Sequence, residues 1–380
     1  MKQYITPPGD LVINSYQKKV RNSNLELYRI IVMLMIVAHH YVVNSGLYDV
    51  LYQSSFNPSS SVMLIFGGWG KIGIDCFLLI TGYFMCKSNF SWHKLLKLYL
   101  WFAFYSIFIY LIFLITGHEK LTPVRLMLTL FPLQDFNFNG FTGCFLMFYL
   151  FIPFLNLFLK HLQQKSHKSL ILLLLIFYGI LPTCPKIHIP FNYVSWFMAI
   201  YVIAAYIRFY GIFPRVTHKT WGIFTMILIL SCSVSVLGME AIYKLGVVDK
   251  FVPYFFVTDS NKIIPTMTAV ASFMYFKDLK IPQSKLINAI GGATFGVLLI
   301  HANSDAMRQW LWKETVDSVG HFSNYSVLWT LGYAAVSVLL IFIICAGIDW
   351  FRGKYIEPYL ISFFMNKGRK LKNLLIPLVK

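Results

Sequence analysis

The stretch Asn24–Asn44, which reads NLELYRIIVMLMIVAHHYVVN, decides the fold class. Its apolar middle is about as long as the roughly 20 residues that an α-helix needs to cross a bilayer core of ~30 Å. Four ionisable side chains nevertheless lie on the same run, namely Glu26, Arg29, His39 and His40. We therefore expect a membrane-spanning helix that carries polar groups into the membrane.

The composition of the whole chain extends this reading. The 380 residues are 57% hydrophobic and only 13% charged, whereas soluble domains carry about 25% charged residues. Lys and Arg give a net charge of +18, but they occur in small clusters between apolar runs, which is typical of topology determinants and not of a nucleic-acid surface. The sequence predicts an all-α integral membrane protein without a nucleic-acid partner.

Ten apolar runs are long enough to predict about ten transmembrane helices in one bundle. A polar segment at residues 1–23 precedes this domain of residues 24–350, and a basic tail at residues 351–380 follows it. The predicted spans are Leu25–Ser45, Val62–Cys86, Leu95–Thr116, Phe141–Leu159, Leu170–Leu181, Tyr193–Tyr210, Trp221–Leu237, Asp259–Phe276, Ile287–Asn303 and Val327–Ile348.

The basic residues predict the orientation of the bundle. With both termini in the cytoplasm, 24 Lys and Arg residues fall on the inner side and 8 on the outer side. An excess of this size on one side identifies the cytoplasmic face by the positive-inside rule. The first 23 residues lack the apolar core and cleavage site of a signal peptide, so we expect the first span to remain as an anchor.

The first span carries a polar stripe. Arg29 and His40 are 11 residues apart, which places them within about 20° of one helix face and ~16 Å apart along the axis. Glu26 and Asn44 lie one turn outside them near the same face, whereas His39 points about 100° away from His40. A lone buried histidine is usually structural, but an arginine on the same face favours a site at His40.

Further polar groups lie in or beside later spans. Lys71 and Asp75 are four residues apart in the second span, where they form either a structural ion pair or part of a site. Lys94 and Lys97 follow in a basic and aromatic segment that suits either donor phosphates or anchoring at the interface. His301 and Asn303 end the ninth span. The six cysteines lack metal-ligand spacing, so we expect inert thiols and no metal.

These residues occur in patterns that resemble the acyltransferase-3 family of multispan membrane enzymes, which O-acetylate or otherwise O-acylate surface glycans. The family's N-x-E-L-x-R, with a histidine eleven residues after the arginine, is matched by Asn24, Glu26, Leu27, Arg29 and His40. This spacing selects His40 over His39.

Three later stretches also resemble family motifs. GWGKIGIDCFLLITGYFM contains Gly73, Asp75, Gly82 and Tyr83 where the family has G-V-D-x-F-F-x-x-S-G-[FY]. FNGFTGCFLMFYLFIPFLN matches the region ending in P-x-L-N, and TFGVLLIHAN matches the late F-G-V-Y-L-I-H-[DE]-N. Two departures stand out: lysines replace an arginine-rich element at the third span, and the acidic residue after His301 is missing.

The resemblance implies a reaction. Acyl-CoA, with acetyl as the expected acyl group, would reach a cavity from the cytoplasm, and His40 would serve as a general base or as a transient acyl carrier. Glu26 would orient Arg29, which would bind donor phosphate together with Lys94 and Lys97. The remaining candidates would contact the acceptor or line its cavity: His39, Asn44, Lys71, Asp75, Tyr83, His301 and Asn303.

The acceptor implied is a hydroxyl of a cell-surface or lipid-linked glycan, and the place implied is a bacterial cytoplasmic membrane. Charges within spans also mark translocation paths, so a transporter or flippase for lipid-linked sugars is the main alternative. A glycan polymerase is a third reading, which the lack of a long outer loop rich in Arg disfavours. Oligomeric state is left open by the sequence.

Overall fold

The fold is described from a computed structural model, for residues 21–53, 57–131, 140–187, 189–190, 192–324 and 326–365. Of the expected polar segment at residues 1–23 and basic tail at 351–380, residues 1–20 and 366–380 therefore lie outside the described residues. Within the described part the chain is helical and contains no strand. The elements are α1 (Ser23–Val43), α2 (Leu47–Gln53), α3 (Pro58–Gly67), α4 (Gly70–Met85), α5 (Trp92–Ile115), α6 (Pro123–Leu130), α7 (Phe141–His161), α8 (Gln164–Leu174), η1 (Leu175–Ile180), α9 (Leu181–Thr183), α10 (Tyr193–Tyr210), α11 (His218–Lys244), α12 (Ile263–Asp278), α13 (Lys285–His301), α14 (Asp305–Arg308), η2 (Gln309–Thr315), α15 (Ser318–Asn324), α16 (Val327–Phe351) and η3 (Arg352–Ile356).

Eight of the ten predicted spans correspond to described helices that are long and apolar enough to cross a membrane. The eighth predicted span differs, because α12 begins at Ile263, four residues later than Asp259, and has only 16 residues. The preceding segment turns, with the Lys262 amide donating to the Asp259 carbonyl over 3.2 Å. The ninth corresponds to α13, which together with residues 305–322 forms a pair bent by 96°.

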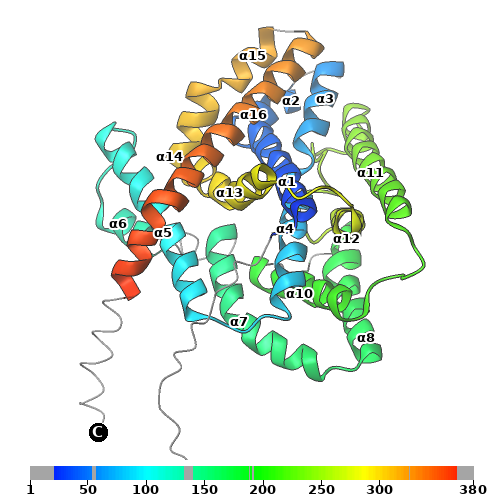
Figure 1. Cartoon of the computed structure of the whole chain (residues 1–380). Helices are drawn as coiled ribbons and strands as arrows, with labels where there is room; N and C mark the ends of the chain where they lie inside the picture. Colours follow the sequence, from blue (N-terminus) through cyan, green and yellow to red (C-terminus); the bar gives the residue numbers. More distant parts are fainter. Residues whose placement is uncertain are drawn as a thin grey trace, which may run out of the picture.

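Helix α1 lies at the centre of the bundle (Figure 1). It packs against α4, α13, α16, α3 and α12, while α10 packs on the far side of α4. Helices α8 and α11 lie at the periphery, and the apolar spans that contain them are only 11% and 17% buried. These exposed apolar faces suit contact with lipid.

Glycines bring α4 close to α1. A Cβ added at Gly70 would lie 2.3 Å from the His39 ring, and one at Gly73 would lie 2.7 Å from Ile36. Small residues at such positions let membrane helices approach closely. The close contact holds the two helices that carry the polar residues side by side.

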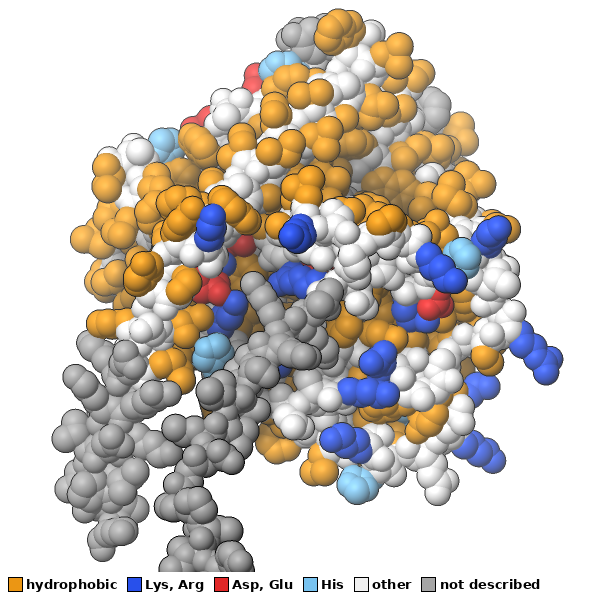
Figure 2. Space-filling model, viewed as in Figure 1, with side chains coloured by type: hydrophobic (Ala, Val, Ile, Leu, Met, Phe, Trp, Pro, Cys, Tyr) orange, Lys and Arg blue, Asp and Glu red, His pale blue; other side chains and the backbone are white. Residues whose placement is uncertain are grey.

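The surface divides into two regions (Figure 2). Hydrophobic side chains cover the upper half of the view, where α15, α16 and α3 lie. Lys and Arg side chains gather in the lower half, over the ends of α7, α8 and α10. The segregation of apolar and basic surface is that of an integral membrane protein.

Candidate active site

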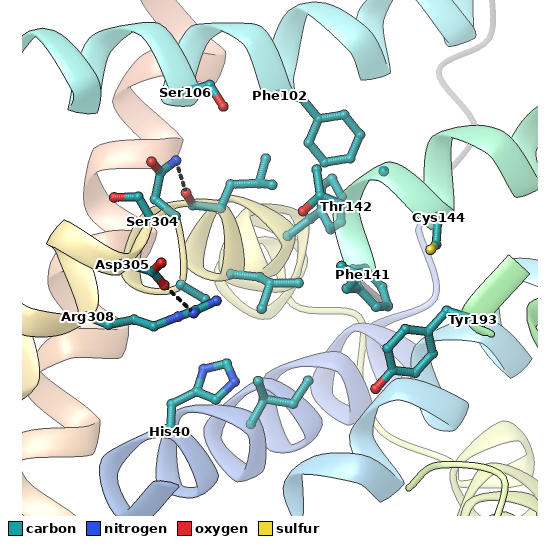
Figure 3. A pocket seen from close by; sticks show the side chains of 18 of the residues that line it. His40, Phe102, Ser106, Phe141, Thr142, Cys144, Tyr193, Ser304, Asp305 and Arg308 are labelled. Atoms are coloured by element: carbon teal, nitrogen blue, oxygen red, sulfur yellow. Dashed lines mark hydrogen bonds and ion pairs between the residues drawn. The ribbon is translucent and has the colours of Figure 1, made fainter. Parts of the chain in front are cut away.

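A cavity of about 540 Å³ opens among the ends of several helices (Figure 3). Such a volume lies in the range of small-molecule sites. The C-terminal half of α1, the N-termini of α4, α7 and α10, and the α13–α14 bend all contribute to its wall. Of the predicted residues, it is lined by His39, His40, Lys71 and Asn303.

His40 contacts His301 across the wall of the cavity. Nδ1 of His40 lies 2.9 Å from Nε2 of His301, and Nδ1 of His301 lies 2.6 Å from the Val297 carbonyl oxygen. Because a carbonyl only accepts, the proton of neutral His301 is on Nδ1 and its Nε2 accepts from His40. His301 is fully buried, and burial of a charged ring is costly, which favours this neutral form.

This chain of hydrogen bonds assigns the tautomer of His40. With its proton on Nδ1, His40 keeps an unprotonated Nε2, which is the atom that accepts a proton in base catalysis. Figure 3 shows the ring pointing from α1 into the cavity. The sequence placed His40 on the polar face of α1 but gave no sign that His301, 261 residues away, would meet it.

His39 has a different environment. Its Nδ1 lies 2.5 Å from the Gly67 carbonyl oxygen at the end of α3, and its ring packs against α4 at Gly70. Since the carbonyl accepts, Nδ1 of His39 carries the proton. His39 thus closes the cavity wall beside His40 and is held by backbone.

Lys71 and Asp75 do not form the ion pair that their spacing suggested. Lys71 Nζ donates to the Tyr193 hydroxyl over 2.9 Å, and Asp75 Oδ1 accepts from Trp196 Nε1 over 2.8 Å. No salt bridge between the two is formed in the structure. Both side chains instead bond to residues of α10. The four-residue spacing along α4 does not indicate that another helix supplies these partners.

The bend after α13 contributes residues that the sequence analysis missed. The Ser304 hydroxyl caps α14 by accepting from the Met307 amide over 3.2 Å, as serine does at helix starts. The short helix places Arg308 at the cavity, where Nη1 pairs with Asp305 over 2.7 Å. Figure 3 shows the Arg308 side chain and the His40 ring directed into the same space. The sequence signal that could have indicated α14 is a serine followed by a helix-forming segment.

A second arginine and carboxylate pair also lines the cavity. Nε of Arg125, on α6, lies 3.7 Å from Oε2 of Glu119 in the loop before that helix. In sequence both residues look like ordinary loop charges. Only the fold brings them to the cavity wall.

The residues expected at the cytoplasmic end of α1 lie apart from the cavity. Glu26 is buried and pairs with Arg29 over 2.9 Å and with Arg21 over 3.3 Å. The predicted orientation of Arg29 by Glu26 is therefore present, and Arg21 joins it. None of the three lines the cavity around His40.

Of the other predicted residues, the cavity is lined by Asn303 but not by Lys94, Lys97, Tyr83 or Asn44. Lys97 pairs with Glu357, and Lys94 is exposed. Tyr83 accepts a hydrogen bond from Arg208 over 2.8 Å at the end of α4. Asn44 ends α1, and its backbone amide donates to the His40 carbonyl over 3.0 Å. Asn303 donates from Nδ2 to the Leu299 carbonyl over 2.9 Å.

The sequence model of one family, described as an acyltransferase domain, matches residues 22–346. The chain belongs to the acyltransferase-3 family. The match includes α1, α4 and α13, the helices that carry His40, Lys71 and His301. Comparisons with curated proteins and with solved structures gave no match.

Family membership and the apolar helices make this acyltransferase an integral membrane protein. Membership of an acyltransferase family does not favour the alternative that the protein is a transporter or flippase for lipid-linked sugars. Within the described residues no three His, Cys, Asp or Glu side chains lie together as metal ligands. None of the six cysteines forms a disulfide, and five of them are buried. The charged and titratable groups that line the cavity include imidazole, ammonium, guanidinium and carboxylate.

Proposed function

We propose that this acyltransferase moves an acyl group, acetyl by expectation, from acyl-CoA to a hydroxyl of a cell-surface or lipid-linked glycan, in a bacterial cytoplasmic membrane. The observation that carries the proposal is the contact between His40 and His301 at 2.9 Å beside a cavity of about 540 Å³. That contact leaves an unprotonated nitrogen facing the space in which substrates would meet.

The chemistry follows from this geometry. Nε2 of His40 removes the proton of an acceptor hydroxyl as its oxygen attacks the thioester carbonyl. The carbonyl oxygen becomes an oxyanion, and the guanidinium of Arg308 faces the same space and stabilises the negative charge. Collapse of the intermediate breaks the carbon–sulfur bond, and the proton passes from His40 to the leaving thiolate. The products are an ester and coenzyme A.

His301 supports the base. Once Nε2 of His40 takes the proton, the ring is a cation whose Nδ1–H still donates to His301. A hydrogen bond to the charged form stabilises it. The same arrangement also serves the second route, in which His40 Nε2 attacks the thioester and carries the acyl group transiently.

The donor is proposed to enter from the cytoplasmic end. Arg29 lies ~16 Å from His40 along α1 and offers a guanidinium to phosphate, and Lys94 and Lys97 in the first turns of α5 are proposed to assist it. Met33 and Ile36 line the cavity on the side toward Arg29. An apolar wall of this kind suits the pantetheine arm of coenzyme A, with the phosphates held nearer Arg29.

The acceptor is proposed to enter from the outer side. By the positive-inside rule the N-terminal ends of α4 and α10 face outward, and Lys71 and Tyr193 lie there. Reporter fusions at Met1 and Lys380 test this orientation. Both are expected to report the cytoplasm, and an outside location for both would reverse the proposed direction of transfer.

Donor dependence tests the function itself. Membranes with and without the protein are supplied with radiolabelled acetyl-CoA and with de-acylated surface polysaccharide from a strain lacking the gene. We expect label on the polysaccharide only when protein and thioester are both present. Translocation of lipid-linked sugar without any thioester requirement would instead support a flippase and overturn the proposal.

A further inference from the structure

A second cavity of about 450 Å³ lies next to the first. The two cavities have His39 and Lys71 in common, so these side chains form a shared wall. The second cavity is otherwise lined by the end of α1 and the loop after it, by Tyr48 and Asp49 on α2, by Gly68 between α3 and α4, and by the segment before α12. It therefore lies at the same end of the bundle as the α13–α14 bend.

The carboxylates of the two cavities differ in their partners. In the first cavity Glu119 and Asp305 each pair with an arginine. In the second, Asp49 and Asp259 form no salt bridge with any described residue. Lys71 lies near Asp259 and interacts with it electrostatically without pairing. The second cavity thus presents acceptor oxygens that no described cation occupies.

Aromatic rings accompany these carboxylates. Tyr48 and Tyr254 line the second cavity with ring centroids 5.7 Å apart. The Tyr254 hydroxyl donates to the Leu64 carbonyl over 2.9 Å, which fixes that ring. Ionised carboxylates accept hydrogen bonds from several hydroxyls at once, and tyrosine rings offer rigid apolar faces. Together they suit a ligand with many hydroxyls on an apolar ring.

We infer that the second cavity is a subsite for a neighbouring sugar of the acceptor, so that the acceptor recognised is at least a disaccharide. This inference rests on the proposed function. One sugar would place its hydroxyl at His40 in the first cavity. The next would lie across the wall of His39 and Lys71, with its hydroxyls donating to Asp49 and Asp259.

The shared wall explains why the two sites act together. The backbone at Gly67 holds His39, and the hydroxyl of Tyr193 holds Lys71. A sugar chain that contacts this wall from both sides positions its reactive hydroxyl beside His40 more firmly than a single sugar does. The energy of remote binding is thereby used for orientation at the reacting centre.

Size dependence tests the inference. De-acylated surface polysaccharide is hydrolysed to single sugars and to longer fragments, and transfer from radiolabelled acetyl-CoA is measured with each. For the wild-type protein we expect the longer fragments to have a KM about tenfold lower than single sugars. For Asp259→Asn and Asp49→Asn we expect this preference to fall to near unity, with the rate on single sugars and the KM for acetyl-CoA unchanged.

Asp249→Asn provides the matched control. Asp249 is exposed in the same loop region but lines neither cavity, so its substitution should keep the size preference. Elution as a monodisperse peak in detergent shows that each variant is folded. The inference is wrong if folded Asp259→Asn and Asp49→Asn proteins both keep the full preference, or if the wild type uses single sugars equally well. Failure of wild-type protein to acylate any fragment would instead refute the proposed function.

Discussion

Two polar regions inside this protein differ in what their polar groups contact. At the C-terminal end of α16, Asp349 Oδ1 accepts from Trp101 Nε1 over 2.9 Å, from the Tyr105 hydroxyl over 2.8 Å and from Arg352 Nε over 2.9 Å. Arg352 also pairs with Glu357 over 2.8 Å. Around His40, by contrast, the imidazole ring faces a cavity (Figure 3).

The comparison distinguishes polar groups that stabilise a membrane bundle from polar groups that take part in a reaction. Both regions carry the high cost of removing polar groups from water. In the Asp349 region the groups satisfy one another and join α5, α16 and η3. In the His40 region a hydrogen-bond chain anchored on backbone ends at an atom available to a substrate. Substitutions in the Asp349 region should therefore lower stability, whereas substitution of His40 should lower the rate of acyl transfer.

The largest expected effect is on catalysis by His40→Ala. Loss of a general base commonly costs 10²- to 10⁴-fold in rate, so we expect transfer from acetyl-CoA to fall by about 10³-fold with normal insertion. His39→Ala should be milder, because the Gly67 carbonyl and not a substrate is its named partner. Retained activity in a normally expressed His40→Ala protein would contradict the assignment.

The next effect concerns stability, at Asp349→Ala. Breaking a buried ion pair costs about 3–5 kcal/mol, and we expect the lower end because Glu357 still contacts Arg352. The measurement is the thermal unfolding midpoint in detergent, compared with that of His40→Ala. We expect a clear fall for Asp349→Ala and little change for His40→Ala. Equal midpoints for the two variants would remove the distinction between the regions.

A smaller effect is expected for Arg29→Lys. A guanidinium binds phosphate through two parallel hydrogen bonds that an ammonium does not reproduce, so the KM for acetyl-CoA should rise about tenfold. If Arg29 only reaches the interface and pairs with Glu26, lysine has a similar stem and should serve almost as well. An unchanged KM and rate would therefore exclude Arg29 from the donor site.

Much of the fold was predictable because long apolar runs have few alternatives in a membrane. Eight predicted spans are found as helices that satisfy the length and hydropathy of a span. The two exceptions are short: α12 starts only after a turn, and α13 bends into α14. Composition does not show where a backbone turns, because a turn depends on local hydrogen bonds such as those at Lys262 and Ser304.

The sequence analysis identified individual residues of the site but not the residues that they contact. Helical spacing placed His40 and Arg29 on one face, and the family motif selected His40 over His39. Spacing also suggested pairing of Lys71 with Asp75, yet α10 supplies nearer partners to both. Contacts such as His40 with His301 depend on the packing of α13 against α1, which no periodicity within a single helix encodes.

The account rests on His40 and His301 acting as one unit, and a double-mutant cycle tests this directly. Transfer from acetyl-CoA is measured for His40→Ala, His301→Leu and the double variant, with folded fractions equalised. We predict that the double variant is no slower than His40→Ala alone, since residues acting as a unit are non-additive. We also predict that His301→Gln, whose amide oxygen accepts from Nδ1 of His40, retains more activity than His301→Leu. A double variant whose loss of activity equals the product of the two single losses would contradict the account. Wild-type activity in His301→Leu would contradict it as well.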